Sequence, residues 1–264
     1  MPRPRVYKTE AIVLRQRKLG EADKIVTLYT SHQGKLDAVA KGVRRTKSRL
    51  AGHLEPLTLG AYLLAEGREL DIVTQADTVE AFPALRDDLE RLSRGLYCAE
   101  LVERLTPERS EANPVFRLLA ETLGYLNSAP EYELVARRFE LRLLGELGYR
   151  PSLVECAVCG KRLEPEANFW SSDAGGALCP GCADDSLRLA PLSLNALKLL
   201  RLMQRAPFED VARVRVSGAL AAELESCLGD YVRYVLEREV RSARFVETLR
   251  QTRVLKDGTA PQAP

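Results

Sequence analysis

The chain has 264 residues, of which 45% are apolar, and a formal net charge of +2. At this length we expect two or three domains, each large enough to bury a core of its own. No run of about 18 apolar residues is present, and the opening MPRPRVYK lacks the apolar stretch of a signal peptide. The composition therefore argues against membrane insertion and secretion, and we expect a cytoplasmic protein with no membrane partner.

Positive charge is concentrated near the N-terminus. Residues 1–50 contain 13 Lys or Arg against four acidic residues, whereas residues 51–100 contain four Arg against ten acidic residues. An ordinary solvated surface mixes both signs, and segregation into one segment is the pattern expected of a surface that binds a polyanion. The charge distribution therefore favours a nucleic-acid partner for the first 50 residues.

Short apolar runs separated by turn signals fill residues 9–80. They indicate about five strands, interrupted at Leu19-Gly20, at His32-Gln33-Gly34 and at residues 66–69. Five short strands in so few residues suggest a small closed barrel, and the OB-fold is a common barrel of this size that binds nucleic acids. We place this domain at residues 1–81, although the periodicity fits an SH3-like barrel equally well.

Helical spacing of apolar residues begins after Pro83 and continues to residue 147. Three prolines divide this stretch into three or four helices: Pro107, Pro114 and Pro130. Helical spacing returns at residues 194–203 and 218–250, with Ser193 and Ser217 as N-caps. The predicted helical body therefore has two parts, residues 82–151 and 189–250, followed by a disordered tail at residues 251–264.

Four of the six cysteines follow the pattern C-x2-C-x19-C-x2-C: Cys156, Cys159, Cys179 and Cys182. Each pair is spaced to lie on a tight turn that directs two sulfurs at one tetrahedral Zn2+ ion, with Gly160 and Gly181 allowing a close backbone approach. The residues between the pairs predict two short strands around a turn at Gly175-Gly176. We therefore predict a zinc finger, inserted at residues 152–188.

Two disulfides are the alternative interpretation of the four cysteines, and a reducing cytoplasm disfavours them. Four thiolates complete the coordination sphere and leave no position for a water molecule, so the single zinc ion is expected to be structural. Cys98 and Cys227 lie among apolar helical residues and are expected to fill core space.

The sequence offers little catalytic machinery. Its two histidines, His32 and His53, lack neighbouring carboxylates or cysteines, and no G-x4-G-K-[ST] motif for a nucleotide phosphate is present. Some acidic residues imitate a two-metal nuclease site but lie at predicted helix starts, where acids favour the helix dipole: Asp87, Asp88, Glu90, Asp184 and Asp185. We expect a binding protein without catalytic residues or a nucleotide cofactor.

The densest basic segment is AKGVRRTKSRL, between two predicted strands, and it contributes Lys41, Arg44, Arg45, Lys47 and Arg49. A basic loop beside a barrel contacts phosphates without requiring a particular base sequence. Five further basic residues near the first strand turns are expected to extend this DNA-binding track: Arg15, Arg17, Lys18, Lys24 and Lys35. Tyrosines are scarce here, so we expect electrostatics to outweigh base stacking.

The segment AIVLRQRKLGEADKIVTLYTSHQGKLDAVAKGVRRTKSRL resembles the N-terminal barrel of bacterial RecO proteins, with the elements G-E-x-D-x-I-V, T-x-x-x-G-K-L and A-K-G-x-R-R. The later order of FELRLLGELGYRPSL, C-x2-C-G-K and FWSSDAGGALC is similar to the zinc-bearing members of that family. Together these similarities cover most of residues 8–200.

The resemblance implies an α+β protein with an N-terminal OB-fold, an all-helical C-terminal body and an inserted four-cysteine zinc finger. It also implies binding of single- and double-stranded DNA, annealing of complementary strands without ATP, and association with the nucleoid. The partners that it implies are RecR, single-strand-binding protein and, indirectly, RecA. The charge map and cysteines alone also fit an RNA- or ribosome-associated protein with a barrel and a zinc ribbon.

Overall fold

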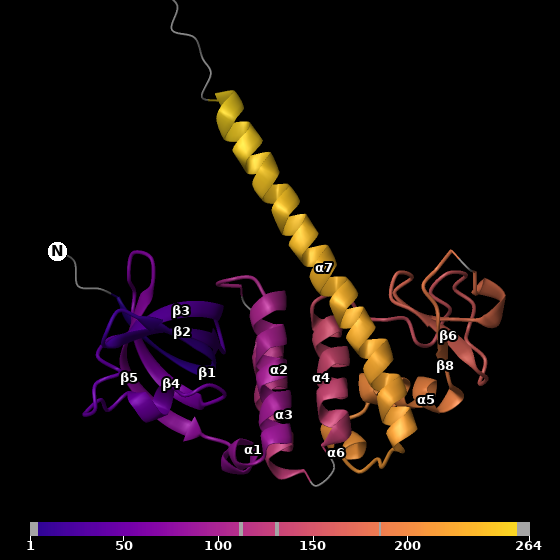
Figure 1. Ribbon diagram of the computed structural model, residues 1–264, viewed down its shortest axis with the longest axis horizontal. Helices are drawn as coiled ribbons and strands as arrows, with labels where there is room; N and C mark the ends of the chain where they lie inside the picture. Colours follow the sequence, from indigo (N-terminus) through magenta and orange to yellow (C-terminus); the bar gives the residue numbers. More distant parts are fainter. Residues whose placement is uncertain (1–4, 111–112, 130–131, 185, 258–264) are drawn as a thin grey trace, which may run out of the picture.

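A computed structural model describes residues 5–110, 113–129, 132–184 and 186–257. Figure 1 shows a strand-rich domain at one end, a bundle of helices in the middle and a small finger at the other end. The last helix crosses the bundle and continues beyond it. Among the described residues, no helix has both the length and the apolar composition that a bilayer-spanning segment needs.

The N-terminal domain is a closed barrel of five strands in the order β1-β2-β3-β5-β4: β1 (Val6–Leu19), β2 (Asp23–Thr30), β3 (Gly34–Ala40), β4 (Leu59–Ala65) and β5 (Asp71–Glu80). The first three strands form an antiparallel meander, and β1 also pairs with β4. A short parallel pairing of β3 with β5 closes the barrel. This order confirms the OB-fold prediction over the SH3-like alternative.

Alternating apolar residues give the barrel a core of its own. In β3, Leu36, Ala38 and Ala40 point inward and are almost fully buried, while the intervening residues are half-exposed. These side chains form one cluster with residues such as Val26 and Leu64 from other strands. The barrel interior is thus separate from the larger core of the helical body.

The body contains seven helices within the described residues: α1 (Pro83–Asp87), α2 (Leu89–Leu105), α3 (Asn113–Ser128), α4 (Glu133–Glu146), α5 (Leu194–Arg205), α6 (Phe208–Val211) and α7 (Gly218–Asp257). Asp88 caps α2 by accepting hydrogen bonds from two backbone amides, and Glu90 lies in the first turn of this helix, as predicted. The same prediction is wrong for Asp87, which ends α1, and for Asp184, which accepts from the Ser186 amide in a turn. Asp185 lies outside the described residues. Ser193 caps α5, and Ser217 accepts a hydrogen bond from the amide of Leu220.

The segment that follows α2 joins the barrel to the body. It adds a short parallel bridge between Glu108 and Lys35 at the edge of β3, and the Arg109 amide donates to the Lys35 carbonyl at 2.8 Å. The Arg109 guanidinium also forms a 3.1 Å ion pair with Asp71, a carboxylate that is almost fully buried. These contacts fix the barrel against the helices.

The finger is built on a small sheet with the strand order β7-β6-β8: β6 (Asn168–Ser171), β7 (Gly176–Leu178) and β8 (Ala190–Leu192). The predicted hairpin around Gly175-Gly176 is confirmed by the antiparallel pairing of β6 with β7. Trp170 of β6 is buried and meets Tyr231 of α7 edge to face, with ring centroids 5.7 Å apart. The finger therefore packs directly on the last helix.

Two predicted boundaries need correction. The finger sheet includes β8 and so reaches Leu192, beyond the predicted end at residue 188. Helix α7 runs to Asp257, so the prediction of disorder from residue 251 is wrong up to that point. The segment 251–257 contains neither Gly nor Pro and has several good helix formers, which allow the helix to continue. Residues 258–264 of the predicted tail lie outside the described residues.

Candidate metal centre and nucleic-acid interface

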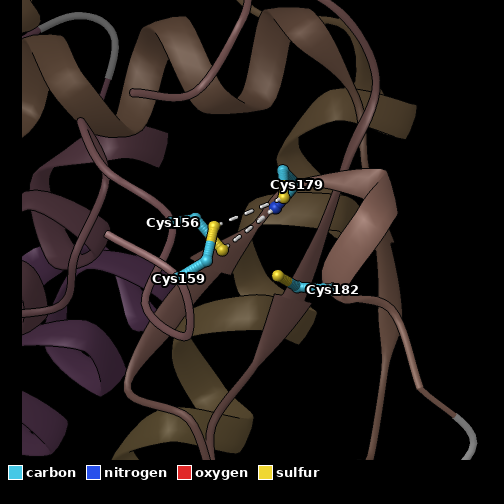
Figure 2. Close-up of side chains that lie close together, drawn as sticks. All are labelled: Cys156, Cys159, Cys179 and Cys182. Carbon is cyan, nitrogen blue, oxygen red and sulfur yellow. Dashed lines mark hydrogen bonds between the residues drawn. The ribbon is translucent and has the colours of Figure 1, made fainter. Parts of the chain in front are cut away.

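The four predicted zinc ligands come together. The sulfurs of Cys156, Cys159, Cys179 and Cys182 all lie within 4.8 Å of one another, and Figure 2 shows the four side chains pointing toward a common centre. The Sγ atoms of Cys159 and Cys179 are 3.9 Å apart. No disulfide joins these cysteines, because bonded sulfurs would be separated by about 2.0 Å.

Two tight turns position the ligands. In the first turn, the Gly160 amide donates to the Cys156 carbonyl at 2.9 Å, and Gly160 has a φ of +71° that favours glycine. In the second turn, the Cys182 amide donates to the Cys179 carbonyl at 3.0 Å within the short 3-10 helix η2 (Pro180–Cys182). Gly181 has no positive φ and no close neighbour, so the close approach predicted for this glycine is absent.

Backbone amides prepare the first cysteine to bind a cation. Burial raises the pKa of the Cys156 thiol, but backbone hydrogen bonds from Cys159, Cys179 and Val158 outweigh this effect and lower it to about 6. The Cys179 amide, for example, lies 3.4 Å from Cys156 Sγ. A thiolate is the form of cysteine that binds metals, so the folded backbone favours the state that the site requires.

The donor set fits a tetrahedral thiolate site. With Zn–S bonds of about 2.3 Å, tetrahedral sulfurs lie about 3.8 Å apart, close to the 3.9 Å between Cys159 and Cys179. Four sulfurs leave no open coordination position for water or substrate, so the arrangement suits a structural ion. Cys98 and Cys227 are buried elsewhere in the core, as predicted.

The basic loop between β3 and β4 presents five unpaired cations. Its residues Lys41, Arg44, Arg45, Lys47 and Arg49 are all exposed, and within the described residues no acidic side chain forms an ion pair with any of them. The loop consists mainly of turns and is anchored by buried Val43 and by the Arg44 amide, which donates to the Ala22 carbonyl at 2.9 Å. The loop backbone is therefore anchored to the barrel, while its five basic side chains remain exposed.

The other predicted contacts differ in availability. Lys18 is exposed beside the same end of the barrel. By contrast, Arg15 pairs with Glu103 at 2.8 Å and Arg17 with Asp37 at 2.5 Å. Lys24 donates to Gln16 and lies 4.0 Å from Glu55.

Lys35 points toward the helical body rather than toward solvent. Its ammonium donates to the Glu103 carbonyl at 2.5 Å, and burial lowers its pKa. The structure therefore groups Lys18 with the exposed loop, in which Arg44 donates to the Gly20 carbonyl at 3.1 Å. Arg15, Arg17 and Lys24 lie beside acidic partners, and Lys35 is partly buried against the body.

The barrel offers no exposed aromatic platform within its described residues. Tyr29 and Tyr62 are fully buried, and Phe82 is 4% exposed. Tyr7 is half-buried and donates to Asp71 at 2.5 Å. Nucleic acids bound here would therefore be held mainly through their phosphates, with little stacking of bases.

Sequence reasoning also missed a second group of cations, on the finger side of the body. Lys198, Arg201 and Arg205 follow one face of α5 at helical spacing. The same segment shows the strongest amphipathic pattern of the described helices, with its apolar face in the core. The spacing of these three residues is visible in the sequence. Which arginines of other segments lie beside them is not, because that depends on the fold.

The fold and site together define a class: an OB-fold protein whose helical body carries a cluster of four cysteines close enough to hold a metal ion and whose barrel bears an exposed basic loop. The N-terminal profile described as "Recombination protein O N terminal" matches residues 4–82, and the profile described as "Recombination protein O C terminal" matches residues 86–244. The chain belongs to the RecO family of DNA repair proteins.

Individual relatives agree with this assignment over nearly their whole length. The chain is 47% identical to "DNA repair protein RecO" of Roseiflexus sp. (strain RS-1), over 94% of this chain and 88% of the relative. It is 36% identical to the protein of the same name from Dehalococcoides mccartyi (strain CBDB1), over 95% and 98%. A third, from Pelotomaculum thermopropionicum, is 38% identical over 94% and 96%.

Proposed function

We propose that this protein is a recombination mediator that binds single- and double-stranded DNA, anneals complementary strands without ATP, and assists the loading of RecA together with RecR. The observation that carries the DNA-binding part is the exposed loop with Lys41, Arg44, Arg45, Lys47 and Arg49, whose charges have no acidic partner among the described residues. The names of the relatives support a role in DNA repair.

The annealing step follows from charge neutralisation. Two single strands repel each other through their phosphates, and a surface that contributes several Arg and Lys side chains lowers this repulsion while counterions are released. Base pairing then proceeds downhill, so the reaction draws on binding free energy and needs neither a nucleotide cofactor nor a catalytic residue. The lack of an exposed aromatic on the described barrel predicts weak sequence preference.

We propose further that Cys156, Cys159, Cys179 and Cys182 hold one Zn2+ ion that stabilises the finger. Zinc supplies folding free energy in such sites and performs no chemistry when four thiolates surround it. The remaining partners, single-strand-binding protein, RecR and RecA, are proposed from the family resemblance, as are the cytoplasmic location and the association with the nucleoid.

An annealing assay tests the function as a whole. Complementary oligonucleotides labelled with a fluorophore and a quencher are mixed with the metal-loaded protein, with ATP omitted and salt varied. We expect faster quenching than without protein, and a steep loss of rate with salt because the Debye length is only about 10 Å at 0.1 M. A strict requirement for ATP, or no acceleration at low salt, would contradict the proposal.

A matched pair of variants tests the loop. R44Q/R45Q removes two charges that have no acidic partner among the described residues, whereas R15Q/R17Q removes two charges of the same barrel that pair with Glu103 and Asp37. We expect the slope of log affinity against log salt for single strands to fall by about 1.4 in the first variant, since each lost contact contributes about 0.7. The second variant should change it far less, and equal changes would remove the loop from its proposed role.

The same binding assay separates DNA from the RNA alternative. The two polymers are compared as single strands of identical sequence and length. Preference for RNA would favour a ribosome-associated function, because contacts to the 2'-hydroxyl distinguish the two. Equal binding or preference for DNA supports the proposal.

A further inference from the structure

Six basic side chains gather around the C-terminal half of α5, far along the chain from the barrel. We call them the α5 basic cluster: Arg142, Arg150, Arg162, Lys198, Arg201 and Arg205. They come from α4, from the segment after it, from the finger and from α5 itself. Four of them, Arg150, Arg162, Lys198 and Arg205, are exposed, and the other two are partly exposed.

Hydrogen bonds to neighbouring segments position three members of the cluster. Arg142 donates to the Gln204 carbonyl at 3.1 Å, and Arg150 donates to the side-chain oxygen of the same residue at 3.4 Å. Arg201 donates to the Leu153 carbonyl at 2.6 Å. All of these acceptors are neutral, and a guanidinium has five N–H donors. Each arginine therefore keeps its charge and most of its donors.

Within the described residues the cluster has no ion pair, although Glu155 lies opposite Arg162 in an isolated β-bridge. None of its six members forms an ion pair with an acidic side chain there, in contrast to arginines such as Arg104, which pairs with Glu100 at 2.6 Å on α2. Burial lowers the pKa of Arg201, and the neighbouring charges of Arg162 and Arg205 lower it further. Like charges that repel each other in this way are stabilised when an anion binds between them.

The cluster lies at the opposite end of the molecule from the basic loop. In Figure 1 the barrel occupies one end, and α5 and the finger occupy the other, with α2 to α4 between them. One strand bound at the loop would therefore leave the cluster free. Annealing brings two strands together, and a second basic surface would give the second strand a place of its own on the same protein.

We propose that the α5 basic cluster is a second nucleic-acid site, which binds the phosphate backbone of one strand while the barrel loop binds the other. This inference rests on the proposed function of the loop. Arginine is suited to the task because its planar fork matches a phosphate with two parallel hydrogen bonds. An acidic protein segment would also be expected to bury apolar surface, and Leu202, 37% exposed, is the one large apolar side chain that α5 exposes.

Energy transfer between two strands of non-complementary sequence tests the proposal. One oligonucleotide carries a donor and the other an acceptor, so a signal reports binding to the same protein and cannot arise from base pairing. We expect the full-length, metal-loaded protein to give transfer at low salt. R162E/R205E changes two exposed side chains without side-chain hydrogen bonds in the described structure, and it should abolish most of the transfer and slow annealing at least about tenfold.

Two controls make the result specific. R104E/R233E introduces the same change of charge at exposed arginines that pair with Glu100 and Asp230 on their own helices, and it should keep both transfer and annealing. A second cluster variant, R150E/K198E, should reproduce the loss. Metal content and thermal melting of each variant establish that it is folded.

The outcomes separate the inference from the function on which it rests. Loss of transfer in both cluster variants, with binding of a single strand within about twofold of wild type, supports the second site. Transfer that survives in a folded R162E/R205E protein overturns it and favours an acidic protein partner for the cluster. If R44Q/R45Q binds single strands as tightly as wild type, the proposed role of the loop fails, whatever the cluster does.

Discussion

The barrel and the finger are stabilised in different ways. The barrel closes over a cluster of its own, with residues such as Val26, Leu36 and Leu64 fully or almost fully buried inside it. The finger has strands of only three or four residues and gathers four thiols within 4.8 Å. A sheet this small cannot bury enough apolar surface for independent stability. The barrel is therefore expected to fold on apolar contacts, and the finger to depend on a metal.

The finger also depends on its neighbour, whereas the barrel interior does not. Trp170, Leu178 and Cys156 belong to the same buried cluster as the helices of the body. Damage to the finger should therefore spread into the body, while the barrel core, a separate cluster, should remain intact. Three changes test this comparison, in order of decreasing expected effect.

Loss of one ligand should have the largest effect. We expect C156S to lower metal content and to destabilise the finger by several kcal/mol, since apparent zinc-binding free energies in isolated finger peptides are about 10–16 kcal/mol. Native-state hydrogen exchange should show fast exchange for residues 152–182 and unchanged protection in β1 to β5. Prolonged treatment of the wild type with a chelator should produce the same pattern.

C227A is the control for this change. Cys227 is buried in the body but lies outside the ligand cluster, so its replacement should keep one metal per chain and cost only about 1 kcal/mol. A C156S protein with normal metal content or unaltered exchange in the finger would refute the dependence on metal.

A substitution at the contact between the barrel and the helical body should have the next largest effect on stability. Gly34 has a φ of +61°, and a Cβ atom built there would lie 2.0 Å from the Ser110 carbonyl oxygen. We expect G34A to cost about 3 kcal/mol, because a left-handed backbone and a steric clash add together. G20A is a matched control, since Gly20 has a φ of +57° and no atom within 4 Å, so it should cost only about 1 kcal/mol. Urea unfolding measures the free energy of unfolding of both variants. Equal losses of stability would show that the segment around Ser110 shifts to relieve the clash.

A buried acid should give the body a pH dependence. Glu140 of α4 is fully buried, and burial raises its pKa from 4.5 to about 7, although Arg137 and Tyr97 oppose the shift and Glu225 adds slightly to it. Its Oε1 atom accepts from Tyr97 at 2.6 Å and contacts Arg137 at 3.0 Å, while Oε2 has no partner. The folded state therefore holds a proton that the unfolded state releases.

Stability should accordingly fall as pH rises from about 4.5 to about 7, because the folded protein binds more protons than the unfolded chain across that window. We expect E140Q to remove this contribution, which is on the order of 3 kcal/mol for a shift from 4.5 to about 7, and to make stability flatter with pH than in the wild type. The difference between the two unfolding curves isolates this one group. A parallel pH dependence in both proteins would show that Glu140 does not titrate in this range.

Local sequence patterns predicted most of the fold correctly. The alternation of apolar residues and the turns at Leu19-Gly20 and Gly34 predicted five strands, and Ser193 was correctly predicted to cap a helix. The cysteine spacing also predicted correctly that four sulfurs come together, because two residues between paired cysteines set the geometry of a turn regardless of the rest of the chain. Boundaries were less accurate at residues 188 and 250, where no strong breaker marks the end of an element.

The sequence by itself determined which residues carry charge, which cysteines form a set and which segments are strands or helices, because these depend on neighbours along the chain. Only the tertiary structure decided which cations remain free. Lys35 and Lys41 are both lysines at the ends of strand β3, yet Lys35 contacts the Glu103 carbonyl while Lys41 stays exposed. Arg162 likewise comes near Arg201 only in the folded protein. Ion pairing and burial depend on residues that are distant in sequence, and folding alone brings these together.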